Sequence, residues 1–338
     1  MAPPEGPCSG YEVAAYVCYP KLSPNFTCAE LYPPQCFLDA FSCGLQAVAD
    51  EVCGRIDESR NCCMMVAGGC PVGRPFIVDG TARLAPLRAG AGWDALADAK
   101  HPSTADLDDA TRQALAEFWA KEALTEHASI ASFSRFVLQL LALGAPSDLI
   151  EDATRAATDE HGHARAAFAF ASAYAGRPFG PSKLDITGAI STTLTAADIA
   201  VAIASEGCVA ETVSALQIRA ASCSAKDPAI RAALERIAGE EMAHAELAWR
   251  TLRWLLANGD ARMRDEVERV FFGATAHVGI GPVVRSPGDA IKMRDHGYLA
   301  PDERRRLAAS AIREVITPSA KALMASLEPG AACTSASV

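Results

Sequence analysis

The sequence lacks the features of several common functional classes. It has no uninterrupted run of 18 apolar residues, roughly the minimum for a helix that crosses a membrane, so we expect no transmembrane segment. Basic residues are fewer than acidic ones, 31 against 41, and the net charge of −10 argues against nonspecific binding to nucleic acid or to an anionic membrane. Phosphate-binding loops and nucleophile triads are also missing, so no such motif indicates a substrate.

The beginning of the chain lacks two further signals. The stretch MAPPEGPCSG has neither the basic start nor the apolar run of a secretory signal peptide. The sequence also has no C-x-x-C pair, the close spacing that zinc sites favour. Cysteine itself is nevertheless concentrated here, because nine of the twelve lie between Cys8 and Cys70.

The nine early cysteines are Cys8, Cys18, Cys28, Cys36, Cys43, Cys53, Cys62, Cys63 and Cys70. Apart from the adjacent pair, their even spacing favours a disulfide framework, and hence an extracytoplasmic location. Reduced structural thiols and a metal cluster stay open as alternatives. Because the number is odd, one thiol is left over or pairs with Cys223 or Cys333.

Composition divides the chain into three parts. Residues 1–100 are rich in Pro, Gly and Cys and predict a small cross-linked module that contains a short hairpin at 76–84. Residues 101–275 have the Ala-rich texture and apolar periodicity of long helices. Residues 276–338 predict a loop, an amphipathic helix over 301–327 and a disordered end.

Four long helices are predicted in the middle part, at 104–143, 147–174, 195–223 and 228–258. Ser103 or Asp106 is the expected cap of the first helix. The segment 176–193 is long enough to return along the second helix, so helices two and three should be parallel. The predicted fold class is therefore all-α, a four-helix bundle with one long crossover, preceded by the disulfide-rich module and followed by extra C-terminal helices.

Two E-x-x-H motifs carry the chemistry. Glu160–His163 lies in the predicted second helix and Glu241–His244 in the predicted fourth. An i, i+3 spacing puts a carboxylate and an imidazole on one face of a helix. Glu126 precedes the first motif, and Glu206 precedes the second at almost the same distance along the chain. Two such helices and two helices that each supply one inward Glu make the ligand set of a di-iron or di-manganese bundle.

Two other glutamates compete for these positions. In an antiparallel helix pair, residues equidistant from the turn lie at the same height along the two helices. Glu122 and Glu160 do not meet this condition, so Glu122 is disfavoured. Glu211 and Glu241 do meet it, so Glu211 stays open. An internal repeat favours Glu206, because EHASIAS at Glu126 matches EGCVAET at Glu206 and leaves Glu211 without a counterpart. The predicted metal ligands are Glu126, Glu160, His163, Glu206, Glu241 and His244, with Glu211 as the candidate for an extra ligand.

The neighbours of these ligands suggest how the site is supported. Asp159 and Glu240 adjoin the motif glutamates and are candidates for orienting the histidines. Four carboxylates and two imidazoles suit two iron ions, and manganese also fits. Neutralisation of the buried acids by arginines is the alternative, and it is disfavoured because the segments around the acids contain few arginines.

From about Asp106 to Phe272 the chain resembles the ferritin-like superfamily, nearest to rubrerythrin-like di-iron carboxylate proteins, through the six predicted ligands. The resemblance implies that Glu160 and Glu241 bridge two metals and that each histidine binds one. It implies a non-haem di-iron oxidoreductase that uses oxygen or peroxide on an unknown small-molecule substrate. The alternative function is iron binding, ferroxidation or metal sequestration without an organic substrate.

The chain also departs from that family. Rubrerythrins usually carry a C-x-x-C iron site, which is missing here, and the resemblance does not cover residues 1–100. A third hypothesis therefore makes the cysteine-rich module a partner-binding unit beside a vestigial bundle. A homodimer is one possible assembly, and the sequence does not decide the oligomeric state.

Overall fold

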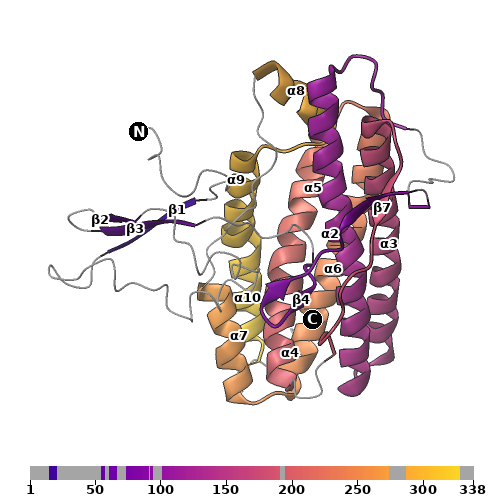
Figure 1. Ribbon diagram of the computed structural model, residues 1–338. Helices are drawn as coiled ribbons and strands as arrows, with labels where there is room; N and C mark the ends of the chain where they lie inside the picture. The colour runs from indigo at the N-terminus through magenta and orange to yellow at the C-terminus, as the bar shows by residue number, and fades with distance from the viewer. Residues whose placement is uncertain are drawn as a thin grey trace, which may run out of the picture.

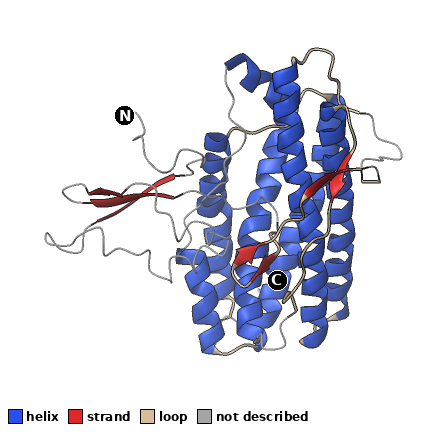
Figure 2. Ribbon diagram, in the orientation of Figure 1, coloured by secondary structure: helices blue, strands red, loops and turns tan. Residues whose placement is uncertain are grey.

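A computed structural model describes residues 15–20, 55–57, 61–66, 74–90, 92–93, 101–190, 195–273 and 287–327 of the chain. Most of these residues are helical (Figure 2), which confirms the prediction of a mainly α protein. The disulfides predicted between Cys8 and Cys70 involve side chains outside the described part. Cys208 and Cys223 are both free thiols.

The first two long helices form a hairpin. Helix α2 (Asp109–Ala142) and helix α3 (Ser147–Ala175) pack along their lengths (Figure 1). Gly144, with φ of +66°, lies in the turn between them, where a left-handed backbone conformation favours glycine.

Helix α2 begins later than predicted. Its cap is Asp108, whose side chain accepts a hydrogen bond of 2.8 Å from the backbone N–H of Thr111. The backbone N–H of Ser103 instead donates to the carboxylate of Asp227 at 2.8 Å. The segment before α2 is thereby tied to the start of α6, so Ser103 and Asp106 do not cap the helix.

The third long helical segment is continuous but not uniform. It consists of α4 (Ala196–Ala202), the π-helix η3 (Ile203–Glu211) and α5 (Thr212–Ser224). Thr195 and Asp198 form a reciprocal capping box at its start. The π-helix was not predicted, and its i→i+5 pattern changes which side chains share a face.

This segment is also the one described stretch whose length and composition would suit a membrane span, at Ala196–Ser224. Of its most apolar window, 61% is buried inside the protein. Such burial is what a core helix shows.

The fourth long helix, α6 (Pro228–Asn258), begins as predicted. The carboxylate of Asp227 accepts hydrogen bonds from the backbone N–H groups of Ala229 and Ile230, at 2.9 and 3.0 Å. Strand β7 (Phe179–Pro181), which follows α3, lies towards the upper end of the helices in Figure 1, whereas α4 lies at the lower end. The chain therefore returns along the helices, and α3 and α4–α5 point the same way, as the sequence predicted.

The C-terminal helices pack against the third segment. Helix α7 (Ala261–Gly273) contacts α4 and η3, and α9 (Pro301–Ala311) contacts α5. The predicted helix at 301–327 is interrupted by the π-helix η4 (Ile312–Ile316) before α10 (Thr317–Ala325). Helix α8 (Pro287–Asp295) was not predicted, because the glycines and prolines around that stretch indicated a loop.

Short strands complete the described structure. The predicted hairpin is present as β4 (Ile77–Val78) and β5 (Thr81–Ala82), with positive φ at both turn residues. Strand β6 (Leu87–Ala89) pairs with β7, a connection that was not predicted. A separate antiparallel sheet has the order β1-β3-β2, in which the strands are Ala15–Pro20, Asn61–Val66 and Arg55–Asp57.

Two apolar layers fill the space between the long helices. One contains Phe133 and Phe136 of α2 together with Leu252 of α6, and the other contains Leu115 and Trp119 of α2 with aromatic residues of α3. On α2, α3 and α6, the residues between the two layers include the sequence-predicted glutamates and histidines. The fold therefore places these polar side chains at one level, enclosed by apolar packing on both sides.

Candidate metal centre

Six acidic and imidazole side chains meet between the two apolar layers. Helix α2 supplies one, α3 two, the end of η3 one and α6 two. They are Glu126, Glu160, His163, Glu211, Glu241 and His244. Glu126 is the most accessible, with its side chain 12% exposed, while Glu211, Glu241 and His163 are fully buried. Burial of so many ionisable groups costs free energy unless they are paired or bind cations.

The six side chains divide into two overlapping groups. Glu126, Glu160, His163 and Glu241 form one group, and in the other His244 and Glu211 replace His163 and Glu126. Within each group, the potential ligand atoms lie within 4.8 Å of one another. Glu160 and Glu241 belong to both groups. The arrangement therefore offers two adjacent cation positions that share two carboxylates.

Glu206 does not belong to this cluster, and the prediction that gave it priority over Glu211 is corrected. Its carboxylate lies 3.8 Å from Nε of Arg74 and 3.6 Å from a guanidinium nitrogen of Arg135. In a regular α-helix, two side chains five residues apart point about 140° apart around the helix axis, so Glu206 and Glu211 would face different ways. The π-helix η3 brings them nearly into line, one turn apart, and Glu211 is the one at the level of the cluster.

Arg74 is a buried neighbour of Glu206 that sequence reasoning missed. It is 2% exposed, and its guanidinium lies 4.8 Å from the ring centroid of Phe133 and 4.3 Å from that of Phe136. The alternative of acids neutralised by arginines thus applies to Glu206. Arg74 comes from the segment before β4, far from α4–α5 in sequence, so no local pattern indicated this contact.

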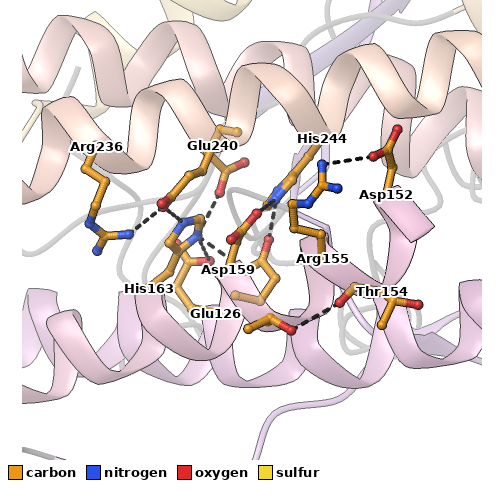
Figure 3. Close-up of polar contacts among 12 residues, drawn as sticks. Glu126, Asp152, Thr154, Arg155, Asp159, His163, Arg236, Glu240 and His244 are labelled. Carbon is orange, nitrogen blue, oxygen red and sulfur yellow. Dashed lines mark hydrogen bonds and ion pairs between the residues drawn. The ribbon is translucent and has the colours of Figure 1, made fainter. Parts of the chain in front are cut away.

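Each histidine is held by a carboxylate from the facing helix. Nε2 of His163 lies 2.8 Å from Oε2 of Glu240, and Nε2 of His244 lies 3.2 Å from Oδ2 of Asp159 (Figure 3). A carboxylate partner requires a proton on Nε2, which leaves Nδ1 as the nitrogen that faces the cluster. The neighbours proposed to orient the histidines therefore lie where that role requires, across the α3–α6 interface. Arg236 pairs in turn with Glu240.

The inward atoms of the cluster have no hydrogen-bond partner within the described part of the chain. They are Oε2 of Glu126, Oε2 of Glu160, Nδ1 of His163, both oxygens of Glu211, both oxygens of Glu241 and Nδ1 of His244. Some are close together, with Nδ1 of His163 at 3.3 Å from Oε1 of Glu241, but they do not align as hydrogen bonds. A buried unpaired polar atom costs about 1–3 kcal/mol, so the donor set fits bound cations better than an empty protein core.

Without cations, protons neutralise part of the cluster. Burial raises the pKa of Glu126 and of Glu211, and repulsion from Glu160 and Glu241, respectively, raises them further. Burial opposes the charged form of His244, but Asp159 and Glu160 outweigh it and raise its pKa to about 9.

The pKa values of His163 and Glu160 on α3 shift in opposite directions. Burial disfavours charge on both His163 and Glu160, yet the carboxylates around His163 raise its pKa, and the two histidines lower the pKa of Glu160. The cluster therefore holds protons at neutral pH, which two divalent cations would displace.

Comparison with models of known protein families, with curated proteins and with solved structures gave no match to this chain. The assignment of a function therefore depends on the residues of the site and their geometry.

Proposed function

We propose that the protein is a non-haem dinuclear metal oxidoreductase that holds two iron ions and uses oxygen or peroxide as oxidant. The proposed ligands are Glu126, Glu160, His163, Glu211, Glu241 and His244. The observation that carries the proposal is the overlap of the two buried groups at Glu160 and Glu241, with inward atoms that lack hydrogen-bond partners among the residues that the structure describes. Manganese is the alternative metal for the same ligands.

The ligand types support this choice of metal. Both groups contain three carboxylates and one imidazole, and sulfur is absent from them. Carboxylate and imidazole ligands suit iron and manganese, whereas thiolates would favour softer ions. Four carboxylates in total nearly balance the charge of two divalent cations, so the filled site can lie between two apolar layers.

We further propose that the fold is a ferritin-like four-helix bundle with one long crossover. Support comes from the four long helical segments, each of which contributes to the cluster, and from the E-x-x-H motifs on α3 and α6. The same direction of α3 and α4–α5 also suits this class (Figure 1). The β1-β3-β2 sheet and the C-terminal helices would be additions to it.

The roles of the protein's residues follow from their positions. Two adjacent iron ions would supply the electrons for reduction of oxygen or peroxide. Glu160 and Glu241 reach both cation positions and would fix the distance between them. Glu240 and Asp159 keep a proton on Nε2 of His163 and His244 and so present Nδ1 to the cluster. The apolar layers on either side exclude bulk water from it.

A second candidate function is iron oxidation and sequestration without an organic substrate. The small space beside the cluster favours it. The cavity that reaches Glu126 and His163 measures about 40 Å³, well below the roughly 150 Å³ of a protein cavity that holds benzene. Turnover that depends on an added organic molecule would favour the first candidate, and iron oxidation that needs none would favour the second.

Metal analysis tests the proposal. Protein reconstituted with iron(II) under anaerobic conditions should contain two ions per chain and should develop ferric absorption when air is admitted. Glu160→Ala should lose both ions, because Glu160 belongs to both groups. Glu151→Ala is the matched control, since Glu151 lies on the same helix but is exposed. Unchanged metal content in Glu160→Ala would refute the assignment.

A further inference from the structure

A cavity of about 40 Å³ leads from the cluster towards α9. Glu126 and His163 line its buried end, and Glu122 and Arg304, whose side chains are 22% and 14% exposed, line it nearer the surface. The wall between them is largely apolar and includes Trp119 and other hydrophobic residues of α2, α5 and α6. The cavity is thus a short apolar passage with polar groups at both ends.

The cavity meets one of the two proposed metal positions. Its lining includes Glu126 and His163, which belong to the first group of ligands, whereas Glu211 and His244 of the second group do not line it. The ring of Phe133 packs edge-on against His244, with 5.0 Å between the ring centroids. The two positions therefore differ in access, and the Glu126–His163 side is the one that a small molecule in this cavity would reach.

Gln217 gives the cavity a specific polar group. The residue is 3% exposed, and its Nε2 donates a hydrogen bond of 3.0 Å to the backbone carbonyl of Arg304. This bond fixes the orientation of the amide, so the other polar atom is the acceptor Oε1. Oε1 is buried and has no hydrogen-bond partner among the residues that the structure describes. A bound molecule with an O–H or N–H group would satisfy it.

The indole of Trp119 adds a second unsatisfied group to the lining. Its Nε1 is buried and likewise lacks a partner in the described part of the protein. An unsatisfied acceptor and an unsatisfied donor together suit a molecule that both donates and accepts hydrogen bonds, such as one with a hydroxyl group. The apolar wall disfavours a charged ligand, because its loss of hydration would not be compensated.

The C-terminal part of the chain lines the outer end. A guanidinium nitrogen of Arg304 lies 3.3 Å from Oε1 of Glu122, which joins α9 to α2. The turn before α9 is packed tightly at Gly297, where an added Cβ would come within 2.9 Å of Ile230 and 3.1 Å of Trp119. The Glu122–Arg304 pair therefore borders the outer end of the cavity, beside a turn that has little room to shift.

We propose that this cavity binds a small, uncharged, hydroxyl-bearing molecule beside Glu126 and His163, that Gln217 recognises it, and that the Glu122–Arg304 pair limits its size. A site of about 40 Å³ is small, so the expected ligand has only a few non-hydrogen atoms. The role of the ligand in oxidation chemistry rests on the proposed function. The binding site itself does not require metal.

Crystal soaks with three simple probes test the site in the full-length protein, both metal-free and zinc-loaded. Methanol is small and has a hydroxyl donor, acetonitrile is of similar size without a donor, and tert-butanol has a donor but is too large. Methanol should occupy the cavity with its oxygen within hydrogen-bond distance of Oε1 of Gln217. Acetonitrile and tert-butanol should be absent. Equal occupancy by acetonitrile, or no methanol in wild-type crystals, would overturn the proposal.

Two variants and a matched control sharpen the test. Gln217→Met should weaken methanol binding by about fivefold to tenfold, as expected for one lost hydrogen bond, and occupancy in a series of methanol concentrations measures this change. Arg304→Ala should admit tert-butanol. Gln113→Met is the control, because Gln113 is also a helical glutamine that donates to a neighbouring side chain, Glu117, but lies outside this cavity. Unchanged occupancy in Gln217→Met would overturn the assigned role of Gln217.

The outcomes separate this proposal from the function on which it partly rests. Elemental analysis of the same zinc-loaded crystals reports whether the cluster binds metal. Methanol bound in a protein that takes up no metal would refute the dinuclear function and leave the cavity assignment standing. Two bound ions with an empty cavity in the methanol soak would support the dinuclear function and refute the cavity assignment.

Discussion

Nε2 of His163 on α3 lies 2.8 Å from Oε2 of Glu240 on α6. A reciprocal contact joins His244 on α6 to Asp159 on α3, at 3.2 Å between Nε2 and Oδ2. Each carboxylate immediately precedes the glutamate of the E-x-x-H motif on its own helix, yet it serves the histidine of the other motif. The two motifs are therefore built as an interlocked pair across one helix interface.

This interlock predicts a loss of metal affinity when either carboxylate is neutralised. Glu240→Gln should weaken binding at the His163 position, because the amide no longer fixes the proton on Nε2 or raises the basicity of Nδ1. The expected effect is about tenfold to a hundredfold on the dissociation constant of one ion. Competition with a coloured chelator measures it.

The control for this variant lies on the same helix. Glu235→Gln changes an exposed glutamate of α6 and should leave both dissociation constants unchanged. If Glu240→Gln behaved like Glu235→Gln, the contact between Glu240 and His163 would have no part in metal binding.

A second prediction distinguishes the two glutamates of η3. Glu211→Gln should reduce the metal content from two ions to one, because Glu211 belongs to the group that contains His244. Glu206→Gln should retain two ions, because Glu206 pairs with Arg74 and Arg135 and lies outside both groups. Elemental analysis of the two purified variants, prepared side by side, gives the answer. Loss of an ion from Glu206→Gln alone would restore the order of preference inferred from the sequence.

The correction at η3 shows where sequence reasoning had a usable signal and misjudged it. The midpoint between Glu211 and Glu241 is residue 226, which lies in the short connection between Ser224 and Pro228, as an antiparallel pair requires. The midpoint between Glu206 and Glu241 falls inside α5. From the sequence alone the turn was expected at 223–228, so both midpoints fell within it and the internal repeat decided for Glu206. The π-helix η3 is a rare feature that the apolar periodicity of an α-helix does not indicate.

Other features were predictable only where a local sequence pattern determines them. The ends of α3 and α6 were predicted to within one residue, because glycine, proline and an Asp cap are local signals. The two E-x-x-H motifs converge as expected, since the i, i+3 spacing fixes their faces. Arg74 and the β6–β7 pairing could not be predicted. They depend on contacts between segments that are distant in sequence, and no periodicity records such contacts.

A third prediction concerns the pH dependence of metal binding. The pKa of His244 is raised to about 9, and the pKa values of His163, Glu126 and Glu211 are also raised, so the metal-free cluster carries protons at pH 7. Binding of cations must displace them. Metal affinity should therefore increase with pH between 6 and 8, and loading in a weakly buffered solution should release protons that a pH indicator detects. Loading without proton release would contradict the assigned charge states.

The same pKa shifts make the stability of the metal-free protein depend on pH. His244 has a folded-state pKa of about 9 against a usual value of 6.5, so its stabilising contribution is complete below pH 6.5 and disappears as the pH rises through 9. The raised pKa values of Glu126 and Glu211 act in the same direction. The metal-free protein should lose about 2–3 kcal/mol of unfolding free energy between pH 6.5 and 9 from His244 alone. Urea denaturation at several pH values measures this loss, and the His244→Gln variant should show a flatter profile.

The buried position of Arg74 leads to the final prediction. Arg74→Met removes one of the two cations beside Glu206 and leaves a carboxylate that is 7% exposed with Arg135 as its remaining ionic partner. Breaking a buried ion pair from one side costs about 3–5 kcal/mol, and Arg135 should reduce the loss to the lower end of that range. Urea denaturation of the metal-free variant would measure it.

A double variant separates the lost ion pair from lost packing against Phe133 and Phe136. Arg74→Met combined with Glu206→Gln removes the charge of the carboxylate as well, so it should recover part of the stability lost in Arg74→Met. If the double variant were no more stable than Arg74→Met, the stabilising role of Arg74 would lie in its stacking on the two rings rather than in its charge. Both variants should still bind two ions, because Arg74 and Glu206 lie outside the ligand groups.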